Sequence, residues 1–204
     1  IISDDCSPNQ DKIQEVVESF NNINIKLYLQ KKNLREPRNK NFLVSKANGK
    51  FNINIGDDDL LHPKSLLIIK NFIDKNKDFD VYMFGYKVID EYDNLIYSRK
   101  SPKKLIINNS NKFISKQVYL SDIFPFWMYH PAVFCCKKGI EMNFQYVDNV
   151  GIGEDFQLFY KLFNNSKKII VIPDYIFYWR KIQNTINNKT QINQSLEDLS
   201  NFTA

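Results

Sequence analysis

Three adjacent aspartates, Asp57, Asp58 and Asp59, are the residues of this chain best suited to chemistry. They follow Gly56 at the end of an alternating apolar segment, and neighbouring carboxylates repel one another unless their charge is compensated. A Mg²⁺ or Mn²⁺ ion compensates it, because such an ion takes one or two protein carboxylates and completes its shell with phosphate oxygens and water. The alternative is a solvated loop in which Asp59 caps the helix that follows.

Two further aspartates, Asp4 and Asp5, follow the apolar residues at 1–2. An aspartate where a strand ends can accept hydrogen bonds from the N–H of a nucleobase or from ribose hydroxyls. The alternative is structural, since Asp commonly closes a turn with a Ser that follows it, here Ser7. Taken in isolation, the pair favours the turn.

A third acidic pair, Glu154 and Asp155, comes directly after Gly151 and Gly153 and opens a pattern typical of an amphipathic helix. The structural alternative is that the dipole and the unpaired N–H groups of a helix start stabilise these carboxylates. The functional interpretation is that a glycine-containing loop presents Asp155 to a cleft as a general base.

Basic and aromatic residues supply the other candidate groups. Arg38 and Arg180 can each face a phosphate, because a guanidinium matches its geometry, or can be ordinary surface or ion-pairing residues. His130, near Trp127, is a candidate for lining an acceptor pocket, with a structural aromatic cluster as the alternative. No catalytic triad or metal cluster can be built around His130 and the second histidine, His62.

Helix-like and strand-like periodicities alternate over the first third of the chain. Such alternation is typical of parallel strands with helices packed on them, and it places the aspartates where strands end. The predicted elements are a strand ending at Ile2, a helix over 10–20, a strand over 23–29, a helix over 38–48, a strand over 51–55 and a helix with Pro63 in its first turn.

The pattern then changes to a predicted hairpin, with a strand over 81–89, a turn at Asp93 and Asn94, and a return strand over 95–98. The later predicted elements are a polar loop over 99–112, a helix over 113–123, a strand over 131–136, a helix over 154–163, strands over 168–172 and 175–179, and a polar tail.

The composition fits one domain with a small extension, because 204 residues, 43% of them hydrophobic, can bury a full core. The net charge of +5 suits anionic partners, although a coding bias toward Lys explains it as well. No RNA-recognition or zinc-finger pattern is present, so nucleic acid is not an expected partner. Three cysteines without a Cys-x-x-Cys pair, and no visible signal peptide, predict a cytoplasmic protein with reduced thiols.

In their order along the chain, these motifs resemble those of the family 2 glycosyltransferases, which have the GT-A fold. The similarity runs from Ile1 to about Arg180, and the ordered set is more specific than any single motif. The matching stretches are residues 1–7, Arg38-Asn39, residues 47–51, the metal motif at 56–63, the Glu-Asp motif at 153–159 and Trp179-Arg180.

The resemblance implies a role for each group. Asp5 would contact the uracil of a UDP-sugar, Arg38 would lie near the nucleotide, and Asp57 would face the ribose. Asp58 would bind Mn²⁺ or Mg²⁺ between the phosphates, in a motif of the Asp-x-Asp type, and Asp155 would be the catalytic base of an inverting enzyme. The supporting residues would be Asp4, Asp59, Glu154 and Arg180.

The chain differs from the family pattern in three places. Gly56 stands where members often carry Asp, and Ile182 stands where a His is often found. The family's first strand and helix have no counterpart before Ile1. We expect the natural protein to contain them, because backbone groups exposed at that edge would need partners.

We therefore expect an α/β fold of the GT-A type, with a mostly parallel sheet flanked by helices, divided into a Rossmann-like nucleotide-binding half and a mixed acceptor-binding half. Residues 1–98 would form the half that binds the nucleotide-sugar, and residues 99–180 the half that binds the acceptor and holds the base. Residues 181–204 would form a partly helical tail.

The expected activity moves a hexosyl or N-acetylhexosaminyl group from a UDP-sugar to a hydroxyl of a glycan, lipid-linked or protein acceptor, in surface polysaccharide or glycan biosynthesis. One alternative is a catalytically degenerate module that only binds nucleotide-sugars. Another is a sugar nucleotidyltransferase, which would need a Gly-rich phosphate loop that the sequence lacks. Peripheral contact with the inner face of a membrane through basic residues is compatible with the charge.

Overall fold

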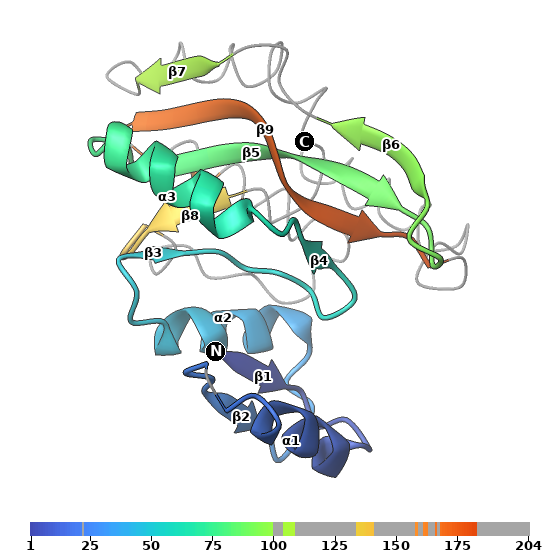
Figure 1. The fold of residues 1–204 in the computed structure, drawn as a ribbon. Coiled ribbons are helices and arrows are strands. Elements are labelled where there is room, and N and C mark those ends of the chain that lie inside the picture. The colour runs from blue at the N-terminus through green and yellow to red at the C-terminus, as the bar shows by residue number, and fades with distance from the viewer. Residues whose placement is uncertain are drawn as a thin grey trace, which may run out of the picture.

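The computed structural model describes residues 1–21, 23–99, 104–108, 134–140, 158, 161–162, 166 and 168–182. Its strands form a small sheet and a larger one (Figure 1). Helix α2 (Glu36–Lys46) lies between the two sheets, and helix α3 (Ser65–Lys75) lies against the larger one. The predicted α/β class is confirmed.

The small sheet is the parallel pair β1 (Ile2–Asp4) and β2 (Leu27–Leu29), connected by helix α1 (Gln10–Glu18). A parallel pair needs such a crossover, because the chain must return to the same end before the second strand begins. The Gln10 side-chain amide donates to the Asp4 carboxylate over 2.7 Å and to the Gln30 carbonyl over 3.1 Å. The ends of β1 and β2 are thus fixed to the start of α1.

Helix α2 is fixed to the small sheet by paired hydrogen bonds and by an aromatic contact. The Ser3 hydroxyl donates to Asn39 Oδ1 over 2.6 Å, and Asn39 Nδ2 donates to the Ser3 carbonyl over 3.2 Å. Phe42 of α2 meets Tyr28 of β2 edge to face, with ring centroids 5.2 Å apart. Pro37 lies in the first turn of α2, where its fixed φ suits a helix start.

Seven strands make up the larger sheet within the described part of the chain: β3 (Phe51–Asn52), β4 (Leu60–Leu61), β5 (Val81–Ile89), β6 (Leu95–Arg99), β7 (Leu105–Asn108), β8 (Phe134–Lys137) and β9 (Lys168–Arg180). Five run in the order β3-β8-β5-β9-β4, while β6 pairs with β5 and β7 with β9. The β5–β9 pair is parallel, and the other pairs are antiparallel.

The long strands β5 and β9 form the centre of the protein, and Phe84 and Ile170 are fully buried in them. Helix α3 covers this pair with Ile69, which is buried, and with Phe72, whose ring meets that of Phe84 edge-on at 6.1 Å (Figure 1). Burying a large apolar side chain contributes about 1.5–3 kcal/mol. The buried apolar side chains of α3, β5 and β9 therefore supply much of the stability of the fold.

The mixed strand pairing agrees with the mixed half that the sequence predicts, but it also includes β3, which was expected in the parallel half. β3 pairs antiparallel with β8, and Ile53 and Ile55, which were predicted to continue that strand, lie outside it. An alternating apolar pattern indicates which residues are extended, but the partner and direction of a strand depend on segments far away in the chain. The larger sheet is therefore mixed.

β9 is a single strand where the sequence predicts two, over 168–172 and 175–179. Its pairing with β5 shifts in register between Met83↔Val171 and Gly85↔Tyr175. Over this stretch β9 therefore contains two more residues than β5. The Pro-Asp pair at 173–174 usually indicates a turn, but here it belongs to an irregularity that the sheet accommodates.

Other local expectations also need correction. Helix α3 begins after Lys64, so Pro63 precedes the helix, and Leu66 and Leu67 of α3, expected on its apolar face, are 67% and 58% exposed. β4 was not predicted, β7 lies within the predicted loop over 99–112, and β2 is shorter than the predicted strand. The predicted helix over 113–123 lies outside the described residues.

Two further features concern the setting of the protein. Within the described ranges, no helix is both long enough and apolar enough to cross a membrane.

All three cysteines are free, with Cys135 and Cys136 buried and Cys6 exposed. The prediction of reduced, mostly buried thiols agrees with this.

Tyr86 of β5 makes the stability of the fold sensitive to alkaline pH. The residue is 2% exposed and its ring stacks on Phe177 with centroids 5.4 Å apart. Burial and the nearby Tyr97 raise the pKa of Tyr86 to about 12, although Arg99 acts against them. In the unfolded chain a tyrosine ionises near pH 10, so the stability from neutral Tyr86 is complete below about pH 10 and is lost as the pH rises toward 12.

We predict that Tyr86→Phe reduces the loss of unfolding free energy between pH 10 and 12 by roughly 2 kcal/mol, because phenylalanine has no proton to lose. Denaturant unfolding at a series of pH values measures this. Tyr92→Phe is the matched control, because Tyr92 is 77% exposed. Identical alkaline profiles for the parent and Tyr86→Phe would contradict the prediction.

Candidate functional site

The predicted metal motif forms a loop, called here the acidic loop (residues 56–59), that runs directly into β4. β4 pairs antiparallel with β9, with Leu60 opposite Tyr178. The acidic loop therefore lies beside the end of β9, where Arg180 is the last residue. Folding brings Asp59 and Arg180 together although they are 121 positions apart in the sequence.

Two carboxylates of the acidic loop close over the α-carbon of Gly56. A Cβ on this residue would stand 2.8 Å from Asp58 Oδ1 and 3.3 Å from Asp59 Oδ2. The first distance is shorter than real Cβ contacts allow and the second is tight, whereas the backbone of Gly56 does not adopt positive φ. A side chain at position 56 would therefore require the Asp58 and Asp59 carboxylates to shift.

Asp59 is held through the backbone of Arg180. The Arg180 N–H donates to Asp59 Oδ1 over 3.0 Å, and Asp59 is buried, with 8% of its surface exposed. The Arg180 Nε donates to the Asp58 carbonyl over 3.0 Å. Asp59 therefore fixes the acidic loop and does not cap α3, while Asp57 and Asp58 remain exposed.

The other side of the Arg180 guanidinium faces the turn between β5 and β6, called here the hairpin turn (residues 90–94). Its Nη1 forms an ion pair with Asp93 Oδ1 over 2.6 Å and lies 3.5 Å from the carbonyl oxygens of both Asp90 and Glu91. The ion-pairing alternative for this arginine is therefore realised. Arg180 connects the acidic loop to the hairpin turn.

The hairpin turn is built around the Asp90 carboxylate. This carboxylate accepts the N–H of Tyr92 over 2.9 Å, the N–H of Asn94 over 2.8 Å and Asn94 Nδ2 over 3.1 Å. These hydrogen bonds, those from Asn94 foremost, hold the pKa of Asp90 below its ordinary value. Asp93 adopts φ 69°, a left-handed conformation that Asp tolerates better than most residues.

The first acidic pair lies at the end of β1. Asp4 Oδ2 accepts the N–H of Ser7 over 2.9 Å, which is the turn predicted as its structural role. Burial raises the pKa of Asp4, but the hydrogen bonds from Ser7 and Gln10 outweigh it, so the pKa is lowered. Asp5 Oδ1 accepts the N–H of Leu34 over 2.6 Å and so fixes the loop after β2.

The family model described as "Glycosyl transferase family 2" matches residues 1–136. The chain belongs to this family. The matched stretch of this family 2 chain contains the acidic loop, the first acidic pair and the hairpin turn, whereas β9 with Arg180 lies beyond it.

Relatives of this family 2 chain are distant in sequence. An uncharacterized glycosyltransferase of Methanocaldococcus jannaschii is 23% identical over 176 residues, which make up 85% of this chain and 57% of that protein. The structure of residues 1–349 of S. aureus TarS in complex with UDP has a TM-score of 0.70 at 17% identity, over 97% of this chain and 54% of that one. TarS in complex with UDP-GlcNAc has a TM-score of 0.68 at 18% identity over the same shares.

These comparisons show the shared fold. The chain spans only about half the length of the proteins that it matches.

The remaining predicted site residues divide into two groups. Arg38 is exposed on α2, and its role at the nucleotide stays a prediction. Trp127, His130, Glu154 and Asp155 lie outside the described residues, and their predicted roles stay predictions as well.

The predicted helix after Asp155 is described at three positions. Leu158, Lys161 and Leu162 are helical. Leu158 and Leu162 are buried in the core, 5% and 1% exposed. Two of the three described positions of this helix therefore contribute to the core.

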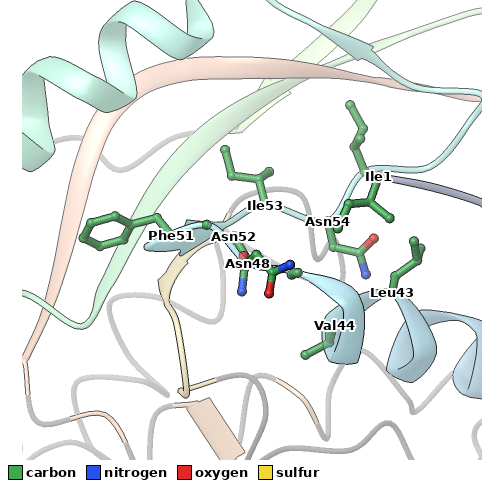
Figure 2. A pocket seen from close by; sticks show the side chains of 11 residues that line it. Ile1, Leu43, Val44, Asn48, Phe51, Asn52, Ile53 and Asn54 are labelled. Carbon is green, nitrogen blue, oxygen red and sulfur yellow. The ribbon is translucent and has the colours of Figure 1, made fainter. Parts of the chain in front are cut away.

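A cavity of about 300 Å³ opens between α2, β3 and the start of the chain (Figure 2). Figure 2 shows the apolar side chains of Leu43, Val44 and Ile53 around it, together with the amides of Asn48 and Asn54. No charged side chain of the described residues lines this cavity. It therefore offers a diphosphate neither a basic side chain nor a carboxylate that could hold a bridging cation.

The acidic loop can supply some of the ligands of a metal ion but not a complete coordination shell. Within the described ranges, no three His, Cys, Asp or Glu side chains are arranged to hold a metal ion. The exposed carboxylate of Asp58 fits a cation that completes its shell with phosphate oxygens, because Mg²⁺ at nucleotide sites commonly uses only one or two protein carboxylates.

Sequence reasoning missed Asp93 as the partner of Arg180. The turn at Asp93 and Asn94 was predicted, because such residues bond to their own backbone. The ion pair joins positions 87 apart, and no local pattern indicates a contact at that separation. The crowding over Gly56 was also invisible, because it depends on side-chain directions within the loop.

The packing over Gly56 predicts an energetic coupling between Gly56 and Asp58. Gly56→Ala should destabilise the protein by about 1 kcal/mol, because the new methyl group collides with two carboxylates and Asp59 is too firmly held to move. In an Asp58→Ala background the part of this cost that comes from the Asp58 carboxylate should disappear, whereas the part that comes from Asp59 should remain.

Denaturant unfolding of the four variants of this cycle measures the coupling. Asp57→Ala is the matched control background, because it removes the other exposed carboxylate of the same loop. An equal cost of Gly56→Ala in the parent and in Asp58→Ala would mean that Asp58 does not lie over Gly56.

Proposed function

We propose that this protein is an inverting glycosyltransferase that moves a sugar from a UDP-sugar to an acceptor hydroxyl. Membership of glycosyl transferase family 2 supports the general class of activity. The observation that carries the proposal is the convergence of the Asp58 and Asp59 carboxylates over Gly56, in a loop that Arg180 fixes at the end of β9. This arrangement sets exposed carboxylates beside a firmly held one.

The proposed reaction needs one base and one leaving group. Asp155 takes the proton of the acceptor hydroxyl as the oxygen forms a bond to the anomeric carbon. The bond from that carbon to the diphosphate breaks with its electron pair, and UDP leaves on the face opposite the attacking oxygen. The anomeric configuration is therefore inverted, and the protein is regenerated when Asp155 loses its proton.

A Mn²⁺ or Mg²⁺ ion is the proposed cofactor, held by Asp58 with support from Asp59. When bound, it would neutralise the charge that develops on the departing diphosphate. The acidic loop keeps the Asp58 carboxylate exposed. The loop is held in place because Asp59 and the Asp58 carbonyl are both hydrogen-bonded to Arg180.

The proposed nucleotide contacts are Asp5 with the uracil, Arg38 near the nucleotide and Asp57 with the ribose. TarS has been solved with UDP and with UDP-GlcNAc, and the similarity of fold favours a UDP-sugar donor here, with a hexosyl or N-acetylhexosaminyl group. Asp5 is well placed to order its surroundings, because it holds the loop after β2 through Leu34.

The proposed acceptor is a glycan, a lipid-linked sugar or a protein, in surface polysaccharide or glycan biosynthesis. Trp127 and His130 are the candidates for contacting it. We propose that the protein is cytoplasmic and contacts the inner face of the membrane peripherally. The net charge of +5 favours this membrane contact.

Nucleotide binding is the first test of this proposal. We expect calorimetry on the full-length protein to show UDP binding that depends on Mn²⁺ and is tighter than binding of GDP or CMP. Asp58→Ala should weaken it by roughly tenfold or more, because the cation loses a carboxylate. Asp78→Ala is the matched control, an exposed aspartate that precedes β5. Folded protein that binds no nucleotide would contradict the proposal, whereas nucleotide binding without sugar transfer would favour the catalytically degenerate alternative.

The role of Asp155 has a separate test. Asp155→Asn should lower the transfer rate by roughly 10²–10⁴-fold, because an amide cannot accept the proton of the acceptor. The dissociation constant for UDP with Mn²⁺ should stay near that of the parent. A variant that transfers sugar at a near-normal rate would exclude Asp155 as the base.

A further inference from the structure

The Asp93–Arg180 ion pair links the hairpin turn to the acidic loop. Asp93 belongs to the turn, and Arg180 contacts the acidic loop twice, through its backbone N–H to Asp59 and through its Nε to the Asp58 carbonyl. Asp93 is 64% exposed by side chain and Arg180 only 18%, so the guanidinium is enclosed between the two loops.

The hairpin turn is a firm support for this pair. Its Asp90 carboxylate accepts three hydrogen bonds, and the Asp93 N–H donates to the Asp90 carbonyl over 3.2 Å. The Lys181 N–H donates to the Ile89 carbonyl over 2.8 Å, which holds the end of β9 beside the start of the turn. The position of the Asp93 carboxylate is therefore set by the backbone around it.

The contacts of Arg180 divide into two independent parts. The bond to Asp59 uses the backbone N–H and persists whatever side chain stands at position 180. The bond to the Asp58 carbonyl uses Nε, and the direction of Nε depends on where the other end of the same planar group is held. Asp93 holds that other end.

We propose that Asp93 is a positioning residue: acting through Arg180, it fixes the Asp58 backbone and so the direction in which Asp58 presents its carboxylate to a nucleotide-bound cation. This inference rests on the proposed function of the acidic loop. An exposed ion pair contributes little to folding stability. Partners that orient a metal ligand, in contrast, affect metal affinity strongly.

The first experiment measures Mn²⁺ affinity in the presence of UDP, from the electron paramagnetic resonance signal of free Mn²⁺. Asp93→Gly removes the carboxylate and tolerates the positive φ of this position. Its dissociation constant for Mn²⁺ should be roughly tenfold higher than that of the parent. Asp93→Asn, which keeps an acceptor oxygen, should fall between the two.

Glu91→Gly is the matched control. It removes one negative charge from the same turn and adds the same backbone freedom. Glu91 meets Arg180 through its backbone carbonyl, which glycine retains. Its Mn²⁺ affinity should equal that of the parent, and a loss as large as in Asp93→Gly would overturn the proposal in favour of a general effect of the turn.

The second experiment needs neither metal nor nucleotide. Hydrogen–deuterium exchange of a peptide covering residues 56–61 should be faster in Asp93→Gly and in Arg180→Met than in the parent, and unchanged in Glu91→Gly. Equal exchange in Asp93→Gly and the parent would overturn the proposal, because the acidic loop would then not depend on the ion pair.

The two experiments separate this inference from the proposed function. If the parent binds no Mn²⁺ with UDP, the proposed function fails, and the exchange rates alone decide whether Asp93 fixes the loop. If the parent binds both and Asp93→Gly binds them as tightly, the positioning role is wrong while the proposed function stands.

Discussion

The pairing of β9 with both β5 and β4 is the constraint on which the rest of the structure depends. The β5–β9 pair supplies the buried centre, with residues such as Phe84, Ile170 and Phe177 removed from water, and this burial provides the main driving force for folding. Because β4 pairs with the far part of β9, the same strand also decides where the acidic loop lies. Stability and the candidate site are therefore set by one element.

Within the site, two contacts of Arg180 have different effects: one stabilises the fold, and the other orients a side chain. Asp59 is buried, and a buried carboxylate without a partner would cost several kcal/mol, so the backbone N–H of Arg180 matters for folding. The ion pair with Asp93 is partly exposed, and such pairs contribute about 1 kcal/mol or less. Its value lies in geometry: it orients the guanidinium that holds the Asp58 carbonyl. This division explains how three neighbouring aspartates can be kept in one loop with two of them exposed.

Much of the local structure could be predicted from the sequence, because it follows from local periodicity and turn chemistry. The helices at α1, α2 and α3, the strand over 81–89 and the turn at Asp93 all lie near their predicted positions. The Asp4–Ser7 turn also follows from the known preference of Asp for closing turns. The prediction of strand ends failed at a Pro-Asp pair, because such a pair can either end a strand or lie at an irregularity within one. Two strands were predicted, over 168–172 and 175–179, but β9 continues through the Pro-Asp pair between them.

By itself, the sequence determined the α/β class, the family and the identity of the acidic groups, because these depend on residue types and on spacings within single elements. Only the tertiary structure decided which strands pair and that Arg180 joins Asp59 to Asp93. It also placed the carboxylates of Asp58 and Asp59 close to the position that a Cβ on residue 56 would take. The physical reason is the same in each case. Such contacts are made between segments far apart in the chain or by side chains turned toward one another, and their free energy exists only once the core has brought those groups together.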